Sequence, residues 1–173
     1  CRRSRASGRE AALMVSLTLI TVGTLKESYL TEGIAEYRKR LLPYARWNEV
    51  NLHEERIADE DDPAQVKRAL EAEGERILRA VPEGSYLIAL CVEGKEMPSE
   101  ELAAVLDRAC TERGGRVAFV IGSSHGLCDR VKRAADLRLS VSRLTFPHQL
   151  MRLMLGEILY RSFTILAGKK YHK

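Results

Sequence analysis

The chain has 173 residues, of which 45% are apolar, and its 28 Lys and Arg residues exceed its 24 Asp and Glu residues by four. This size fits one domain with a full hydrophobic core and excludes two well-packed domains. Residues 1–13 carry four arginines and one glutamate, so residues 14–173 carry only about +1. The net charge is therefore poor support for a polyanionic partner.

The four cysteines form no CxxC pair and have no histidine at metal-ligand spacing. This pattern argues against a zinc module and a dense disulfide framework, and it favours a reduced, cytoplasmic compartment. The longest apolar stretch, 11–22, is too short and too interrupted by hydroxyl residues to cross a bilayer. We therefore expect neither a metal nor a membrane partner.

The arginine-rich N-terminus leaves two interpretations open. One is a secretory signal, or a processed lipoprotein that begins at Cys1. The other follows from the alternation of apolar and hydroxyl side chains over 15–19, which is strand periodicity. This second interpretation predicts a native start at Met14, a single domain at 14–173, and an extension at 1–13 outside the fold.

The hydrophobic pattern then alternates between strand and helix periods along the chain. The first half predicts a strand at 15–22, a helix at 26–41, a strand at 47–52, an acidic loop at 54–62, a helix from 63 to 78, a buried strand at 85–92 and a turn at 93–95. The second half predicts a helix from 99 that ends at Gly114-Gly115, a buried strand at 117–121, a turn at 122–126, a brief helix to 135, a strand at 137–141, a loop at 142–146 and a final helix at 147–167. Such alternation indicates an α/β fold with a mostly parallel sheet and helices on both faces.

Charge is segregated within this domain. Residues 54–112 contain 16 acidic and 7 basic side chains, whereas residues 143–173 contain six basic side chains and only Glu157 as an acid. The C-terminal end is thus a cationic pole. A solvated helix face explains such a run as readily as a binding surface does.

The turn from Gly122 to Gly126 follows a buried strand, where parallel sheets commonly bind ligands. Its GxxxG spacing matches neither GxGxxG nor GxxxxGK[ST], which argues against dinucleotide and nucleoside-triphosphate sites. A tight turn that needs positive φ at one of these glycines is an equally good alternative.

Two further segments carry polar side chains suited to a site. His148 and Arg152 begin the final helix and are expected to share one face near its positive end, where electron-rich groups are favoured. A capping histidine with a solvated arginine is the alternative. The terminal Tyr171-His172-Lys173 combines a ring, an imidazole and a cation, which suits single-stranded RNA, although an unstructured tail is the usual alternative. Neither a nucleophilic triad nor a catalytic carboxylate pair stands out, so hydrolase interpretations have weak support.

Together, ordered motifs from Met14 to Lys173 resemble the bacterial ribosomal RNA large subunit methyltransferase H family. The most specific are Leu139-Ser-Val-Ser-Arg-Leu-Thr-Phe-Pro-His148 and Tyr171-His-Lys173, and others are Thr21-Val-Gly-Thr-Leu-Lys26, Phe119-Val-Ile-Gly-Ser-Ser-His-Gly-Leu127 and Glu157-Ile-Leu-Tyr-Arg-Ser162.

The resemblance implies a SPOUT-class α/β domain with a C-terminal trefoil knot, working as a homodimer in the cytoplasm. It also implies methyl transfer from S-adenosylmethionine to N3 of a pseudouridine in 23S ribosomal RNA within the assembled ribosome. The implied cofactor-binding residues are Leu90, Gly122, Val141, Ser142, Arg143, Leu144, Thr145 and Phe146. Periodicity alone predicts no knot, since chain connections rarely thread loops.

The candidate catalytic roles are base placement for His148, phosphate positioning for Arg152, stacking for Tyr171 and proton handling for His172. The candidate RNA-binding residues are Arg143, Arg152, Arg161 and Lys173. Family members commonly have a second glycine where this chain has Ser123, so this serine must tolerate that glycine's backbone conformation. Two alternatives remain open: a SPOUT methyltransferase that acts on transfer RNA, and a non-catalytic ribosome-assembly factor.

Overall fold

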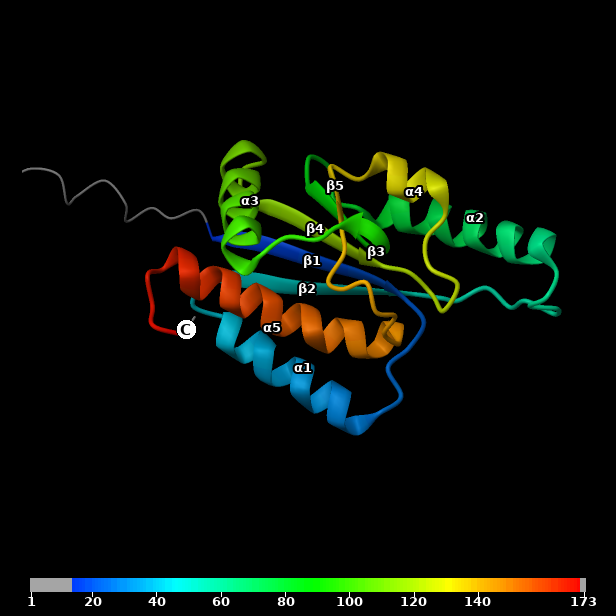
Figure 1. Ribbon diagram of the computed structural model, residues 1–173, viewed down its shortest axis with the longest axis horizontal. Helices are drawn as coiled ribbons and strands as arrows, with labels where there is room; N and C mark the ends of the chain where they lie inside the picture. The colour runs from blue at the N-terminus through cyan, green and yellow to red at the C-terminus, as the bar shows by residue number, and fades with distance from the viewer. Residues whose placement is uncertain (1–13, 172–173) are drawn as a thin grey trace, which may run out of the picture.

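The computed structural model describes residues 14–171, which form a five-stranded sheet with helices on both faces (Figure 1). The elements in chain order are β1 (Val15–Val22), α1 (Ser28–Leu41), β2 (Ala45–Leu52), α2 (Pro63–Ala80), β3 (Tyr86–Lys95), α3 (Ser99–Glu112), β4 (Arg116–Ile121), α4 (Asp129–Ala134), β5 (Leu137–Leu139) and α5 (His148–Leu166). All neighbouring strands are parallel, in the order β2-β1-β4-β3-β5. The α/β fold class expected from the sequence is confirmed.

The sheet separates two hydrophobic layers, because successive side chains of a strand point to opposite faces. In β1, Leu17 and Leu19 belong to the layer that also contains buried residues of α1, α3 and α5, whereas Ile20 and Val22 belong to the layer shared with α2 and α4. Helix α5 packs against both α1 and α3, and Figure 1 shows it running beside α1. Burial on both faces explains why the central strands read as continuous apolar runs.

The prediction of a turn at 93–95 is wrong, because β3 continues through Lys95. A Cβ added to Gly94 would lie only 2.6 Å from the carbonyl carbon of Leu139, and the amide of Ser140 donates to the Lys95 carbonyl at 3.0 Å. Gly94 therefore permits a close approach of the β5 backbone, a common reason for glycine inside a strand. Strand β5 also ends two residues earlier than predicted, at Leu139.

The segment that follows β5 connects the two layers of the fold. It leaves the edge strand beside α4, passes the end of β3, and enters α5 on the other face of the sheet. This path is consistent with the trefoil knot that the resemblance implies. It also carries residues 141–147 to the carboxyl ends of β3 and β4, where the candidate site lies.

Candidate functional site

A cavity of about 670 Å³, here termed the main cavity, lies between the carboxyl ends of β3 and β4 and the loop that precedes α5. Seven of the eight expected cofactor-binding residues line it, namely Leu90, Gly122, Val141, Ser142, Leu144, Thr145 and Phe146. Arg143 lies instead in a shallow hollow that it forms with Glu96, Met97 and Pro98. Residues from three distant parts of the sequence are thus brought to one cavity.

The walls of the main cavity are mostly apolar, and its loop is held by serine hydrogen bonds. Ser140 Oγ donates to the Ser142 carbonyl, and the Leu144 amide donates to Ser142 Oγ, both at 3.0 Å. Burial, assisted by the charge of Glu93, raises the pKa of the Cys91 thiol in the wall, so this thiol is neutral at pH 7. The cavity therefore offers apolar surface and backbone groups, with no thiolate nucleophile.

The turn after β4 depends on its two glycines for different reasons. A Cβ on Gly122 would lie 2.0 Å from the Gly126 carbonyl oxygen, so only glycine fits there, whereas Gly126 has a φ of 86°. None of the non-glycine residues within 14–171 has a positive φ, so Ser123 occupies an ordinary backbone conformation. Ser123, where the resemblance implies a second glycine, is therefore unstrained.

Ser123 also ties this turn to a buried carboxylate that sequence reasoning missed. Its hydroxyl donates to Glu73 Oε2 at 2.9 Å, and the Glu55 amide donates to Glu73 Oε1 at 2.9 Å. Glu73 is only 3% exposed, yet it lies on α2 between Leu70 and Ile77 at helical spacing. An acid on the apolar face of a helix was the available signal, because a buried charge needs hydrogen-bond partners.

A second cavity of about 520 Å³, here termed the adjoining cavity, shares the turn residues 123–125 with the main cavity. Its walls include Gly23 at the end of β1, Glu73, and the segment 53–57 after β2. The sequence predicted an acidic loop at 54–62, which the structure confirms. What the sequence did not indicate is that part of this loop faces a cavity next to the expected cofactor site.

His148 lines the main cavity and lies near Gly23, a wall residue of the adjoining cavity. Its Nε2 lies 3.6 Å from the position that a Cβ on Gly23 would occupy, and Glu54 Oε2 lies 3.2 Å from the same position. Burial and the positive charge of Arg152 lower the pKa of His148, against a smaller opposing effect of Glu54 and Glu73. The imidazole is therefore neutral at pH 7 and able to accept a proton.

Arg152 shares the His148 side of α5, as expected, but it is buried. Only 2% exposed, it donates through Nη2 to the carbonyl oxygens of Val22 at 3.0 Å and Gly23 at 2.8 Å, and through Nη1 to Asn51 Oδ1 at 3.2 Å. The alternative interpretation of a solvated arginine is thus wrong for this chain. Its hydrogen bonds fix the end of β1 beside His148, which is a positioning arrangement rather than a surface for phosphate.

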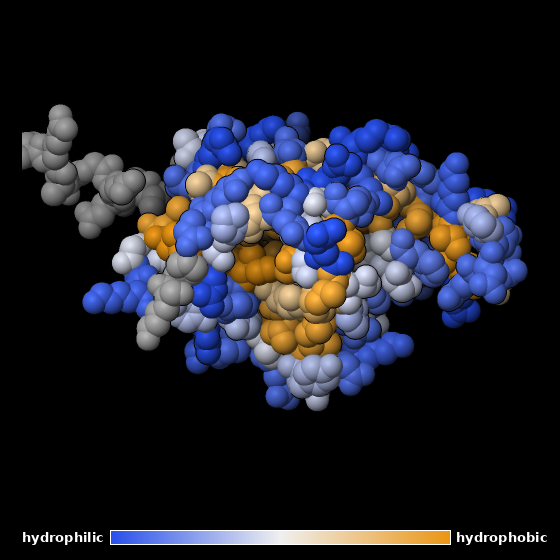
Figure 2. Space-filling model, in the orientation of Figure 1, coloured by the Kyte–Doolittle hydropathy of each residue, from blue (hydrophilic) through white to orange (hydrophobic). Residues whose placement is uncertain are grey.

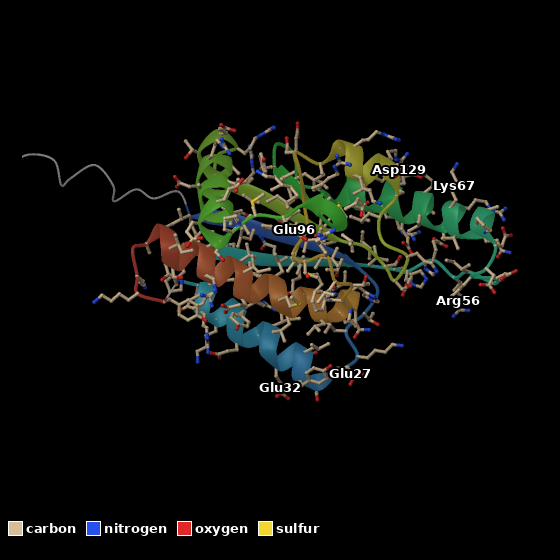
Figure 3. All side chains as sticks on the ribbon, in the orientation of Figure 1. Glu27, Glu32, Arg56, Lys67, Glu96 and Asp129 are labelled. Carbon is tan, nitrogen blue, oxygen red and sulfur yellow. The ribbon has the colours of Figure 1, made fainter. Side chains whose placement is uncertain are left out.

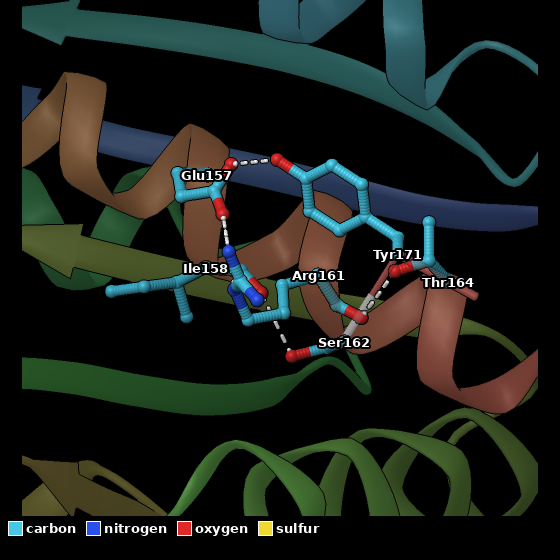
Figure 4. Close-up of polar contacts among 6 residues, drawn as sticks. All are labelled: Glu157, Ile158, Arg161, Ser162, Thr164 and Tyr171. Carbon is cyan, nitrogen blue, oxygen red and sulfur yellow. Dashed lines mark hydrogen bonds and ion pairs between the residues drawn. The ribbon is translucent and has the colours of Figure 1, made fainter. Parts of the chain in front are cut away.

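Tyr171 lies at the opposite end of α5 in the same chain (Figure 4). Its hydroxyl donates to Glu157 Oε2 at 3.0 Å, Arg161 lies 4.9 Å from its ring centroid, and the ring packs edge-on against Tyr160. Burial and Glu157 raise the pKa of Tyr171, so its hydroxyl stays protonated. His172 and Lys173 lie outside the described residues.

Residues 14–171 present neither a metal-ligand cluster nor a membrane-spanning helix. This part of the chain contains no group of three or more His, Cys, Asp or Glu side chains placed to hold a metal ion. None of its helices combines the length and the apolar character needed to cross a membrane.

Comparison with known proteins matches nearly the whole chain. A family model described as "Predicted SPOUT methyltransferase" matches residues 15–172. Proteins named ribosomal RNA large subunit methyltransferase H from Bacillus pumilus and Listeria welshimeri are 47% and 46% identical over 159 residues, which is 92% of this chain and 100% of each relative. A probable methyltransferase from Bordetella pertussis Tohama I shares the fold, with a TM-score of 0.52 at 13% identity over 87% of this chain and 95% of that chain.

Proposed function

This chain belongs to the SPOUT methyltransferases, in the family of ribosomal RNA large subunit methyltransferase H, and from this premise we propose that it methylates N3 of a pseudouridine in 23S ribosomal RNA of the assembled ribosome. The observation that carries the proposal is the match over the full length of relatives that bear this name. S-adenosylmethionine is the methyl donor of SPOUT enzymes.

The main cavity suits S-adenosylmethionine. A volume of about 670 Å³ is in the range of small-molecule sites, and apolar walls with a few polar groups suit a cofactor that carries no phosphate. In this proposal Leu90, Gly122 and the loop 141–146 hold the cofactor. Arg143 of that loop is exposed and lies outside the main cavity, so we assign it to RNA contact.

When bound, the cofactor supplies a methyl group already activated by its sulfonium. The protein has to orient the base, exclude water and receive the proton. Transfer would join the methyl carbon to N3 as the carbon–sulfur bond broke with its electron pair on sulfur, and the residues of the main cavity would hold the two groups in line. We assign the N3 proton to the neutral imidazole of His148, which lines the main cavity.

A homodimer would supply Tyr171 to this site. Within one chain the Tyr171 ring packs on Tyr160, which lies twelve residues, or roughly 18 Å, along α5 from His148. Stacking of Tyr171 on the target base therefore requires a second copy of the chain, together with that copy's His172 and Lys173. Figure 2 shows hydrophobic residues gathered over the middle of the face in view, where Figure 1 places α5. Such a patch suits a subunit interface.

The remaining assignments follow from the substrate. Because the proposed substrate is the ribosome, we assign the enzyme to the cytoplasm. Arg161 at the surface of α5 is a candidate contact for RNA phosphates. Arg152 acts indirectly here, by fixing the end of β1. We assign residues 14–173 to one catalytic domain and residues 1–13 to an extension, because the family match begins at residue 15.

The proposal is tested with ribosomes from a strain that lacks the enzyme. The purified protein is incubated with these ribosomes and S-adenosylmethionine, and the modified nucleoside is mapped by mass spectrometry. We expect N3-methylpseudouridine in 23S ribosomal RNA. Methylation of transfer RNA instead, or a folded protein that shows no cofactor binding in calorimetry, would refute the proposal.

A further inference from the structure

The wall of the adjoining cavity contains a carboxylate that the proposed reaction has not yet used. Glu54 is half-buried, and its Oε1 is 3.5 Å from Ser124 Oγ, at the limit of a hydrogen bond. The next residue differs, because Glu55 Oε1 is 2.5 Å from Nη1 of Arg76. No such ion pair joins Glu54 to a basic side chain within residues 14–171. Its acceptor oxygens are therefore available to a ligand.

Glu54 also lies close to His148, to which the N3 proton is assigned. Glu54 Oε2 and His148 Nε2 lie 3.2 Å and 3.6 Å from the position that a Cβ on Gly23 would occupy, so they are within about 7 Å of each other. The two cavities share the wall residues 123–125. A flat pyrimidine placed between them would meet the imidazole with one edge and the carboxylate with another.

The charge of the adjoining cavity selects what can enter it. Its lining contains more carboxylates (Glu54, Glu55, Glu60, Glu73) than basic side chains (Lys26, Arg56). Carboxylates only accept hydrogen bonds, so a base N–H is favoured beside them. Arg56 also lines this cavity, and Figure 3 shows it on the outer edge of the loop between β2 and α2, where it can meet the RNA backbone.

Pseudouridine differs from uridine in a group that such a site can read. Its ring is joined to ribose through carbon, so both N1–H and N3–H are free, whereas N1 of uridine carries the sugar. We propose that Glu54 is a specificity-determining residue whose carboxylate accepts the N1–H of the target pseudouridine while N3 faces the methyl donor. This inference rests on the proposed function.

The test compares two ribosome preparations, both unmethylated, that carry either pseudouridine or uridine at the target position. We expect wild-type enzyme to methylate the pseudouridine ribosomes roughly tenfold to hundredfold more efficiently, the effect of one charge-assisted hydrogen bond. Glu54→Ala should lower kcat/KM on pseudouridine ribosomes to the uridine level and leave the uridine value unchanged. Glu54→Gln, which keeps an acceptor oxygen without the charge, should give intermediate discrimination.

Glu83→Ala is the matched control, since it removes an exposed carboxylate at the amino end of β3, away from both cavities. It should retain full discrimination. Calorimetry with S-adenosylmethionine should give equal affinities for all variants and shows that each is folded. The inference would be overturned if the Glu54→Ala variant still discriminates between pseudouridine and uridine ribosomes, or if it loses activity on both equally.

The two proposals fail differently in this experiment. Wild-type enzyme that methylates both preparations equally well would overturn the role of Glu54 and leave the proposed function standing. Wild-type enzyme that methylates neither would refute the proposed function itself.

Discussion

The two ends of α5 carry similar side chains and use them differently. At the first turn, His148 and Arg152 are turned inward, and Arg152 is only 2% exposed with its guanidinium on backbone carbonyls. Near the last turns, Arg161 keeps 32% of its side-chain surface exposed and pairs with Glu157 four residues before it. The two arginines are nine residues apart on one helix, but only the first is part of the interior.

The difference shows that a run of basic residues is not one surface. The charge count grouped Arg143, Arg152 and Arg161 into a single cationic pole. In the folded chain, Arg152 organises the site from inside, while the other two remain partly or fully exposed. Burial rather than charge separates a positioning residue from a candidate RNA contact, and the following predictions test that separation.

The largest expected effect is on catalysis at the inward end. His148→Ala should lower the rate of methyl transfer about hundredfold or more, because general-base catalysis is lost. Only the neutral imidazole accepts a proton, so the wild-type rate should fall as the pH decreases through the folded pKa of His148. Since that pKa is lowered, the acid limb should lie below pH 6.5. A single-turnover pH profile measures this dependence of the rate. An acid limb that persists unchanged in the His148→Ala variant would contradict the assignment of His148 as the proton acceptor.

The next largest effect is expected on the stability of the fold, at the N-terminal end of α5. Arg152→Ala should lower the free energy of unfolding by about 3 kcal/mol, because it leaves the carbonyl oxygens of Val22 and Gly23 without these donors. Urea denaturation followed by circular dichroism provides the measurement. A loss below about 1 kcal/mol would mean that the buried arginine does not hold the end of β1.

Truncation after the C-terminal end of α5 should show the reverse pattern, in which activity is lost and stability is kept. Deleting 171–173 should reduce methylation of ribosomes at least tenfold, because the stacking ring is removed, while cofactor affinity is unchanged. The melting temperature should change by only a few degrees, since Tyr171 is 37% exposed and its ring packs edge-on against Tyr160. Mixing this truncated chain with His148→Ala should restore some activity in mixed dimers. Equal turnover by the truncated protein alone would refute the role of the tail.

The smallest effect is expected for Arg161→Ala. Its ion pair with Glu157 is partly exposed, so the loss in unfolding free energy should be under about 1 kcal/mol. The same denaturation experiment compares it directly with Arg152→Ala. Similar losses for the two variants would remove the distinction between the ends of α5.

Local pattern predicted most of the architecture. The strand at 15–22 and the alternation of strands with helices are as expected, because the apolar period depends on neighbours along the chain. The prediction of a turn at 93–95 failed because Gly94 accommodates the backbone of β5, some 45 residues away. No local signal in the sequence reveals this contact. Glu73 was missed although its position on an apolar helix face marked it as unusual.

By itself, the sequence determined the fold class, the family resemblance and the loop expected to hold the cofactor, because these depend on periodicity and on motifs read in order. Only the tertiary structure decided that Arg152 is buried and that Glu54 and His148, more than ninety residues apart, both lie close to Gly23. Such contacts arise where the chain returns across the sheet between β5 and α5. The physical reason is that burial and long-range juxtaposition depend on how distant segments pack, and periodicity carries no information about that packing.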